Sequence, residues 1–447
     1  MKFFNGVNFM QMLRRDFLKS AAAVSVLSVP TWVPRSVFAS EGKPGANERI
    51  GIAGIGVGRQ GHYVFLDSCK QPMGQAVCTC DVYLPRAQDI AKRAGLMEAD
   101  ACQDYRKVLD RKDVDAIVTA TPEHWRALIC VNAALAGKHI YAEKPMSLTV
   151  TEGRLMVKAA RKTGVVFQVG SMQRSMRANQ IACKFIQDGG LGKISEVIAA
   201  NYETPWKCAL PEQPIPEGLD WDTWCGPTEP VPFNHDLFTP RANPGWLSFM
   251  PYSGGEMTGW GTHGLDQVQL ALGMQETGPT EIFVDGDALE LPVYEKSESR
   301  NRGNRLCNTP RLSYSYANGI RVWLGKDGKE SNRGGAIFFG ENAKMEIFRA
   351  NLKTNPREMG EELLRTSPIQ DLSHTRNWLE CIQTGATPLD DCEYGHRTAS
   401  LCHILNIARL MGRSLKWDPK AERFTDCEAA NALLSRPYRK GYVLPEV

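Results

Sequence analysis

Short apolar runs alternate with longer amphipathic segments through the first half of the chain. The amphipathic segments have helical periodicity and are too long to be hairpin turns. The apolar runs have the length of buried strands and lie at residues 49–53, 76–80, 115–120, 139–141 and 165–169. Strands that alternate with helices predict a doubly wound parallel α/β sheet of the Rossmann type.

The pattern changes after residue 170. Residues 194–202 form a longer apolar strand, and residues 206–250 are rich in Pro and Trp without clear periodicity. Residues 311–324 alternate around Asn318-Gly319, which is a strong hairpin signal. Further strands are expected at 336–339 and 344–348, and helices at 263–272, 377–383 and 397–411. This half therefore predicts an α+β domain with a large, mostly antiparallel sheet.

The first forty residues differ from the rest of the chain. Arg14-Arg15 precedes a mildly apolar stretch at 20–29, and residues 37–39 offer the small side chains that a signal peptidase reads. This order resembles a twin-arginine (Tat) signal peptide over residues 1–39, followed by a linker at 40–47. The resemblance implies export through the Tat machinery to the periplasm or beyond the cell. An amphipathic helix of the mature fold is the alternative interpretation.

The composition argues against a nucleic-acid-binding protein, a membrane-spanning protein and a metalloprotein. A net charge of +3 gives no electrostatic reason to expect nucleic-acid binding. No apolar run reaches the 18 residues of a permanent membrane span. The 13 cysteines are scattered without the spacing of zinc ligands, so we expect free thiols and no metal site.

A glycine-rich segment at residues 54–61 lies between the first strand and the first helix. We expect Gly54 to allow the tight turn and Gly56 to let the backbone approach a pyrophosphate, which the amino end of the helix also favours. Asp81 ends the second strand about twenty residues later, which suits the two hydroxyls of a ribose. Strand, glycines, helix, strand and acid together predict a dinucleotide site.

Two features of this segment leave alternatives open. The dinucleotide-binding motif Gly-x-Gly-x-x-Gly, counted from Gly54, requires glycine at its sixth position, where this chain has Arg59. Gly58 and Gly61 lie on either side of Arg59, so the loop is either shifted or longer. Asp81 favours NAD because a carboxylate repels the 2′-phosphate of NADP. Arg59 and Arg86 could counter that repulsion and admit NADP.

The length of 447 residues exceeds what one hydrophobic core usually supports. We therefore expect a dinucleotide-binding Rossmann domain at 48–170 and a substrate-binding α+β domain at 171–447. An exported enzyme has no outside pool of nicotinamide cofactor to draw on. Its cofactor is therefore expected to be held tightly or recycled within each catalytic cycle.

Four further motifs follow in order along the chain. They read TPEHW at 121–125, AALAGKHIYAEKP at 133–145, QVGSMQR at 168–174 and GGEMTGWGTHGLD at 254–266. Together they resemble the Gfo/Idh/MocA family of sugar and polyol oxidoreductases over essentially the whole mature chain. The resemblance implies an NAD(P)-dependent enzyme that acts on CH–OH groups, and subunits that commonly pair through the second-domain sheet.

The resemblance implies that Lys144 and His263 are catalytic. An ammonium beside a cationic nicotinamide releases its proton more readily, so Lys144 would shuttle a proton at neutral pH. The family often has a cis bond before Pro145, which would fix the direction of the lysine. Many members also carry an aspartate four residues before the histidine, where this chain has Gly259.

The resemblance also implies which other residues line the site. The cofactor would contact Thr121, Pro122, His124 and Glu143, together with Lys144, and a capping or packing role is the alternative for His124. Gln173 and Arg174 would line the substrate cleft, and Asp266 would orient His263 or bind sugar hydroxyls. Aromatic faces stack on sugar rings, so Trp206, Trp246 and Tyr252 are expected to bind substrate, with packing of the irregular segment as the equal alternative.

Three functions remain open at this point. The first is a sugar or glycoside oxidoreductase that acts on a ring hydroxyl. The second is an NAD-dependent glycoside hydrolase or lyase, as in some relatives, in which transient oxidation permits elimination of the aglycone. The third is a non-catalytic carbohydrate-binding protein, which the missing aspartate at Gly259 motivates.

Overall fold

The computed structural model describes residues 45, 48–239, 245–296, 310–326 and 334–447. The chain divides into two compact units, Met1–Arg49 and Ile50–Val447. The expected signal peptide at 1–39 lies outside the described residues, and the described helices and strands belong to the second unit, Ile50–Val447. Within the described part of the chain, no helix combines the length and apolar character needed to cross a bilayer.

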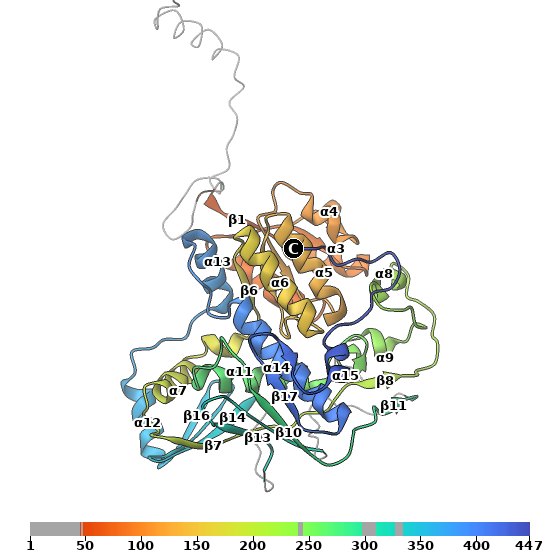
Figure 1. The fold of residues 1–447 in the computed structure, drawn as a ribbon. Coiled ribbons are helices and arrows are strands. Elements are labelled where there is room, and N and C mark those ends of the chain that lie inside the picture. The colour runs from red at the N-terminus through yellow and green to blue at the C-terminus, as the bar shows by residue number, and fades with distance from the viewer. Residues whose placement is uncertain (1–44, 46–47, 240–244, 297–309, 327–333) are drawn as a thin grey trace, which may run out of the picture. The chain divides into compact units, whose positions relative to one another are not determined.

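A six-stranded parallel sheet forms the first half of this unit (Figure 1). Its order is β3-β2-β1-β4-β5-β6, which confirms the predicted doubly wound fold. The strands are β1 (Ile50–Ile55), β2 (Gly74–Cys80), β3 (Ala101–Cys102), β4 (Ala116–Thr119), β5 (His139–Ala142) and β6 (Phe167–Val169). The helices are α2 (Gly61–Lys70), α3 (Leu84–Arg93), η4 (Glu98–Asp100), α4 (Tyr105–Leu109), α5 (Glu123–Leu135) and α6 (Val150–Thr163).

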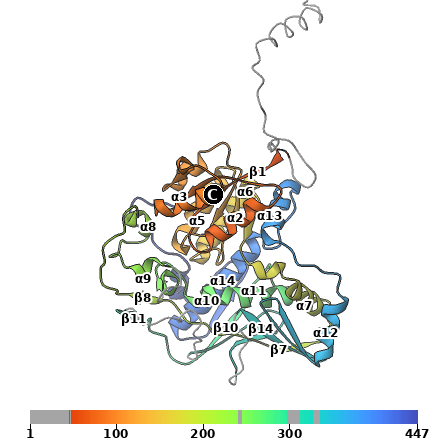
Figure 2. The ribbon, with the colours of Figure 1, turned by 180° about the vertical axis from the view of Figure 1, so that it is seen from behind.

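Alternation of side chains along the strands builds a separate core on each face of this sheet. Ile52 of β1 packs in one core with Phe65 of α2. The next residue, Ala53, packs in the other core with residues of α5 and α6. Trp378 of the later helix α13 (His374–Thr384) completes the first core, and Figure 2 shows α13 beside α2. The second half of the chain therefore helps to cover the parallel sheet.

A nine-stranded sheet forms the second half, in the order β16-β15-β14-β7-β13-β12-β10-β17-β18. Among the described strand pairs of this nine-stranded sheet, only β13 and β7 are parallel, so the sheet is mostly antiparallel, as predicted. Its strands are β7 (Ile194–Ala199), β10 (Glu281–Asp285), β12 (Arg311–Ser315), β13 (Arg321–Leu324), β14 (Gly335–Gly340), β15 (Lys344–Phe348), β16 (Asn351–Asn355), β17 (Leu415–Asp418) and β18 (Arg423–Phe424).

The predicted hairpin is confirmed at Asn318-Gly319. Strands β12 and β13 pair in antiparallel register with Ser315 opposite Arg321. Gly319 has φ 83°, in the left-handed region that glycine adopts without steric cost. The turn residues thus fix the register of the sheet's central strands.

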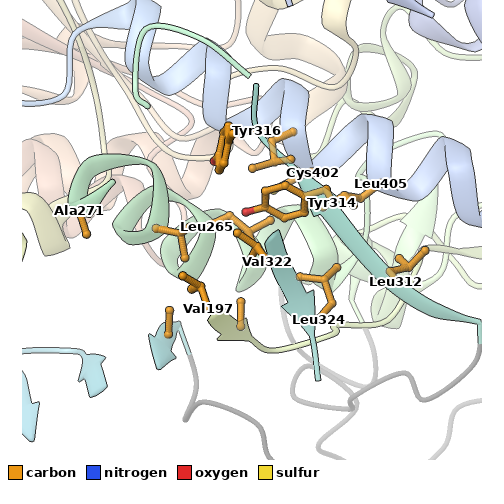
Figure 3. Close-up of a cluster of buried hydrophobic side chains, with 14 of the residues drawn as sticks. Val197, Leu265, Ala271, Leu312, Tyr314, Tyr316, Val322, Leu324, Cys402 and Leu405 are labelled. Carbon is orange, nitrogen blue, oxygen red and sulfur yellow. The ribbon is translucent and has the colours of Figure 1, made fainter. Parts of the chain in front are cut away.

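Two long helices pack on this sheet, α11 (Gly261–Ala271) and α14 (Cys392–Met411). Figure 3 shows Leu265 of α11 and Leu405 of α14 against the apolar faces of the strands. Helix α14 also contacts α6, so it joins the two halves of the unit. Because α11 is held rigidly by this core, its first turn is a stable platform for a site residue.

The remaining elements are further helices around this framework. They are η5 (Met172–Ser175), α7 (Arg177–Gln187), α10 (Glu256–Gly259), α12 (Arg357–Thr366), α15 (Glu428–Asn431) and η8 (Ala432–Leu434).

The irregular segment at 206–250 folds against the parallel-sheet half. It contains β8 (Trp206–Cys208), α8 (Trp221–Cys225), α9 (His235–Phe238), η6 (Trp246–Ser248) and β9 (Phe249–Met250), and β8 also pairs with β11 (Val293–Tyr294). The amide of Leu84 donates to the carbonyl of Gly218 at 3.0 Å, and that of Asp220 to the carbonyl of Val82 at 3.0 Å. These hydrogen bonds bring the segment onto the connection between β2 and α3.

Candidate active site

A cavity of about 990 Å³ opens at the carboxyl ends of strands β1, β2, β4 and β5. In sheets of this type ligands bind at this edge. The residues that follow those strands line the cavity: Gly56, Asp81, Thr121 and Lys144. Residues of the second half, including Gln173 and His263, form its opposite wall.

The glycine turn lies two residues later than the sequence suggested. Gly54 is inside β1, whereas Gly56 has φ 73° and makes the turn. A Cβ on Gly61 would lie 2.0 Å from the carbonyl oxygen of Gly56, so close packing of α2 on the turn requires glycine there. A Cβ on Gly58 would meet nothing nearer than Arg86 Nη1 at 3.7 Å, so this glycine borders open space. The strict Gly-x-Gly-x-x-Gly spacing therefore starts at Gly56, and the expectation that Gly54 forms the turn is wrong.

Asp81 lies at the end of β2 in a buried position on the cavity wall. Its Oδ1 accepts hydrogen bonds from the amide of Tyr83 at 3.0 Å and from Arg86 Nη1 at 3.3 Å. Burial raises the pKa of Asp81, and the neighbouring Arg86 acts in the opposite direction. Arg59 is exposed on the same wall. Together with the glycine turn, this carboxylate fits the ribose end of a dinucleotide.

Thr121, Pro122 and Glu143 also lie on the cavity wall. The carbonyl of Thr121 accepts a hydrogen bond from Arg126 Nη2 at 2.6 Å. Glu143 is buried, and its carboxylate accepts from Gln60 Nε2 at 3.1 Å and from the amide of Lys144 at 3.2 Å. Burial raises the pKa of Glu143. These contacts hold the loop that carries Lys144 against the glycine-rich segment.

His124 is placed away from the cavity formed by the described residues. Its side chain is fully buried, with Nε2 2.8 Å from the carbonyl oxygen of Trp224 and its ring centroid 5.0 Å from that of Tyr252. Burial lowers the pKa of His124 to about 3, so the ring is neutral at physiological pH. The arrangement makes His124 a packing residue, and the expected cofactor contact has no support from its position.

Lys144 and His263 both line the cavity. The Lys144–Pro145 bond is cis, and Lys144 Nζ donates to the carbonyl oxygen of Gly259 at 3.2 Å. His263 lies in the first turn of α11, with its ring centroid 5.8 Å from that of Trp260. Gly259, which stands where the resemblance led us to expect an aspartate, thus offers the lysine a backbone oxygen.

Glu123 is a buried acid that the sequence did not single out. Its Oε1 accepts from Ser253 Oγ at 2.7 Å, and its Oε2 from the amide of Gly254 at 3.0 Å. Burial raises the pKa of Glu123 to about 7, and the charges of Arg126 and Lys144 act against this increase. The carboxyl group therefore ties the start of α5 to the loop that leads into α10. Its place in the TPEHW motif was the only available signal.

Replacement of Glu123 by glutamine is expected to flatten the pH dependence of stability. The folded carboxyl group titrates near pH 7 and the unfolded one near its ordinary value of 4.5. Between these values only the folded chain keeps the proton, so this group makes the free energy of unfolding fall as pH rises. Between pH 4.5 and 7 the free energy of unfolding should therefore fall less in Glu123→Gln than in the wild-type protein, by on the order of 2 kcal/mol. Urea unfolding at a series of pH values in this range measures the difference.

Glu362→Gln supplies the control for this prediction, because Glu362 is an exposed carboxylate on α12 paired with Arg365. It should leave the pH profile of unfolding essentially unchanged. If Glu123→Gln and the wild-type protein lost stability in parallel between these pH values, the raised pKa of Glu123 would be contradicted.

Arg174 and Asp266 form a buried ion pair behind the cavity wall. Arg174 Nη2 lies 2.7 Å from Asp266 Oδ1, and Arg174 Nε lies 3.5 Å from Asp390 Oδ1. All three side chains are buried, and neither Arg174 nor Asp266 lines the cavity formed by the described residues. Burial opposes the charge of Arg174, but the two carboxylates more than compensate and raise its pKa. The expected contacts of Arg174 and Asp266 with substrate therefore have no support from their positions.

The aromatic residues expected to bind substrate separate into two groups. Trp246 lines the cavity. Trp206 packs against Tyr294 with ring centroids 5.5 Å apart, and Tyr252 is fully buried against Trp224 at 4.9 Å. Packing, the alternative considered from the sequence, accounts for Trp206 and Tyr252.

Comparison with known proteins places the chain in a family. Residues 48–171 match the family described as the Gfo/Idh/MocA oxidoreductase family, NAD-binding Rossmann fold, and residues 184–444 match its C-terminal alpha/beta domain. Levoglucosan dehydrogenase of Pseudarthrobacter phenanthrenivorans is 33% identical over 129 residues, which are 29% of this chain and 32% of that protein. The NAD(+)-dependent scyllo-inositol 2-dehydrogenase of Bacillus subtilis is 31% identical over 146 residues, 32% of this chain and 42% of that enzyme.

A glycosyl hydrolase family 109 protein of Shewanella pealeana is 28% identical over 178 residues, 34% of this chain and 38% of that protein. The matches thus span between about a third and under half of the length of these relatives.

Solved structures agree in fold. Levoglucosan dehydrogenase in complex with NADH and levoglucosan superposes with a TM-score of 0.56 at 17% identity, over 82% of this chain and 99% of that one. Aldose-aldose oxidoreductase from Caulobacter crescentus gives a TM-score of 0.53 at 17% identity, over 82% and 99%. From its family matches, this chain belongs to the Gfo/Idh/MocA oxidoreductases and carries their NAD-binding Rossmann fold.

Proposed function

We propose that the chain is an exported NAD-dependent oxidoreductase that acts on a ring hydroxyl of a sugar or glycoside, with NADP as the alternative cofactor. The observation that carries this proposal is the convergence of Lys144 and His263 on the cavity that begins at the Gly56 turn. A nicotinamide bound in this cavity would exchange a hydride with the substrate carbon. The protein side chains would then manage the proton.

Lys144 is the group we assign to that proton. Its Nζ is oriented by the carbonyl oxygen of Gly259 at 3.2 Å, and its backbone is held by Glu143. In the neutral form Nζ accepts the proton of the substrate hydroxyl, and the reverse reaction returns it. His263 lines the same cavity from α11, where its imidazole can bind or relay a proton at a second hydroxyl.

Tight retention of the cofactor is supported by the segment at 206–250. Its hydrogen bonds to Val82 and Leu84 lie directly beside Asp81. Phe238 of the same segment lies under Arg86, with 5.0 Å between the guanidinium carbon and the ring centroid. Phe238 and Trp246 of this segment line the same cavity as Asp81, so a dinucleotide bound there would gain contacts with the segment.

Export through the Tat pathway rests on Arg14-Arg15 and on Val37 and Ala39, at the positions that a signal peptidase reads. A protein exported in the folded state can load its cofactor beforehand, which agrees with tight retention. The test follows the location of the chain in cells when both arginines are replaced by lysine. If the variant stays in the cytoplasm, export by this route is supported, and unchanged export of the variant contradicts it. Pairing of two subunits through the large sheet, which the family resemblance suggests, is tested by light scattering.

A redox-neutral glycoside hydrolase is the second candidate. The matches to glycosyl hydrolase family 109 proteins, at 28% and 30% identity, favour it. It also suits an exported protein, because a cycle of transient oxidation, elimination, hydration and re-reduction needs no outside cofactor. The third candidate, sugar binding without turnover, rests only on Gly259.

One experiment separates the three. The protein is purified without added cofactor, its absorbance in the reduced-nicotinamide band is recorded, and it is incubated with simple sugars and with chromogenic glycosides. Net reduction of bound NAD without bond cleavage supports the oxidoreductase. Aglycone release at a constant redox state supports the hydrolase. Sugar binding with neither change supports the binding protein, and a chain that binds no dinucleotide contradicts the oxidoreductase and the hydrolase.

A further inference from the structure

Two cysteines lie opposite each other on neighbouring strands beside the cofactor site. Cys80 ends β2 and Cys102 ends β3, and the two residues are direct partners in the parallel register of these strands. Both side chains pack in the same core, which places them on the same face of the sheet. Both are free thiols in this structure. The fold therefore brings together two thiols that are distant in the sequence.

The spacing of the strands suits a covalent link between these thiols. Neighbouring strands lie about 4.8 Å apart, and the two Cα atoms of a disulfide usually lie about 4.4–6.8 Å apart. The Cys80 thiol donates a hydrogen bond to the Cys102 sulfur, so the two side chains already point toward each other. A bridge therefore requires rotation of the side chains and no change in strand pairing.

The two thiols differ in exposure and in acidity. Cys102 is half-buried, and its Sγ donates to the carbonyl oxygen of Asp104 at 3.6 Å, whereas Cys80 is buried. The hydrogen bond from Cys80 lowers the pKa of Cys102. The same hydrogen bond, together with burial, raises the pKa of Cys80. Since the thiolate is the form that attacks a disulfide, Cys102 is the thiol that reacts first with an oxidant.

A bridge at this point would act on the cavity wall that carries Asp81. Asp81 follows Cys80 directly, and its amide donates to the carbonyl oxygen of Cys102 at 3.1 Å. Gln103 follows Cys102, and its Nε2 donates to the carbonyl oxygen of Val82 at 2.9 Å. Asp81 and Gln103 both line the cavity. Because β3 is an edge strand of only two residues, a covalent link to β2 would restrict the movement of this wall.

We propose that Cys80 and Cys102 form a disulfide when the chain meets a disulfide oxidant, and that this bridge tightens the dinucleotide site. The Cys102 thiolate attacks one sulfur of the oxidant, which forms a mixed disulfide and releases one thiolate. Cys80 then gives up its proton and attacks Cys102 Sγ, which breaks the mixed disulfide and releases the second thiolate. Two thiols of the protein are oxidised to one disulfide while the oxidant is reduced to two thiols.

Oxidants of this class prevail outside the cytoplasm, where the proposed export takes the chain. The bridge needs only the NAD-binding fold and does not depend on which substrate the cavity takes.

Treatment of the full chain with oxidised glutathione tests the proposal. The reduced protein is exposed to this oxidant, and intact mass with tryptic peptide mapping identifies the product. The product should have lost two hydrogen atoms and should link the peptides that carry Cys80 and Cys102. The bridged form should bind NADH about 2- to 10-fold more tightly than the reduced form, because a rigid site loses less conformational freedom on binding. Fluorescence titration measures both affinities.

Two variants provide the controls, and thermal unfolding of their reduced forms checks that both are folded. Cys102→Ser, whose hydroxyl can keep the hydrogen bond to Asp104, should form no bridge and show no gain in affinity. Cys78→Ala should form the bridge normally, because Cys78 packs in the same core but is not the register partner of Cys102.

Absence of the bridge after oxidation, or a bridge from Cys102 to Cys78 in its place, overturns the proposal. A bridge between Cys80 and Cys102 that leaves NADH affinity unchanged overturns it as well. Failure of the bridged and reduced forms to oxidise any sugar would contradict only the proposed function.

Discussion

Replacing Lys144 with methionine should lower kcat by about 10³-fold, because positioned proton transfer contributes about 10²- to 10⁴-fold. The variant should still bind NADH, since the glycine turn and Asp81 at the other end of the cavity are untouched. Methionine matches the lysine side chain as far as Cε, with a thioether sulfur in place of one methylene, and lacks the ammonium group. Single-turnover reduction of bound NAD, measured beside NADH affinity, separates loss of chemistry from loss of cofactor.

Lys138→Met is the matched control for this prediction. Lys138 precedes strand β5, whereas Lys144 follows it, and Lys138 Nζ donates to the carbonyls of Arg111 at 3.0 Å and Val114 at 2.8 Å. Its loss should lower the free energy of unfolding by about 1 kcal/mol without changing kcat.

Lys144→Arg distinguishes the two roles that Lys144 could have. Arginine remains protonated at every accessible pH, so it should be as inactive as methionine if Lys144 transfers a proton. Substantial activity in Lys144→Arg would show that only the positive charge matters, and normal kcat in Lys144→Met would remove Lys144 from the reaction.

The parallel half of the fold was predictable because its signals are local. Five of the six strands of the first sheet coincide with short apolar runs, whereas β3 has only two residues and was not predicted. Most of the five are followed by a residue of the site, such as Asp81 after β2 or Lys144 after β5. Since parallel strands bring their carboxyl ends to one edge, the order of these residues in the sequence implies their proximity in space. The register of the glycine turn was the exception. Four closely spaced glycines allow two registers, and only the backbone torsion at Gly56 decides between them.

The second half of the site depends on contacts that no local pattern reports. Arg174 and Asp266 were expected to face substrate, but the second carboxylate near Arg174, Asp390, is distant in sequence and makes this a buried network. Strands β8, β9 and β11 are only two or three residues long, too short for alternation to be visible. Arg349 lies in the two-residue turn between β15 and β16, and it lines the cavity. Its place there depends on a hydrogen bond to the distant Gln173, which the local sequence does not reveal.

Replacing Gly56 with alanine should weaken NADH binding about 100-fold. An alanine there would have a positive φ, and its Cβ would lie 2.7 Å from Thr121 Cγ2 and 2.9 Å from the amide nitrogen of Thr121. The turn must then move, which displaces the amides that approach a diphosphate. Loss of one or two such hydrogen bonds, each worth about 1.5–3 kcal/mol to a charged group, gives this factor. The free energy of unfolding should also fall by about 2 kcal/mol.

Two further glycines separate the causes of that loss. Alanine at Gly58 would meet only Arg86 Nη1, at an ordinary contact distance of 3.7 Å, so Gly58→Ala should leave the unfolding free energy within about 0.5 kcal/mol of wild type. It should still weaken NADH binding, because the methyl group occupies space that the cofactor needs. Gly51→Ala places a Cβ 2.1 Å from the carbonyl oxygen of Asp113, so it should destabilise the fold with a much smaller effect on affinity. If Gly56→Ala and Gly51→Ala weakened NADH binding equally, the affinity loss would be a consequence of general destabilisation, and the register that starts at Gly56 would lose its support.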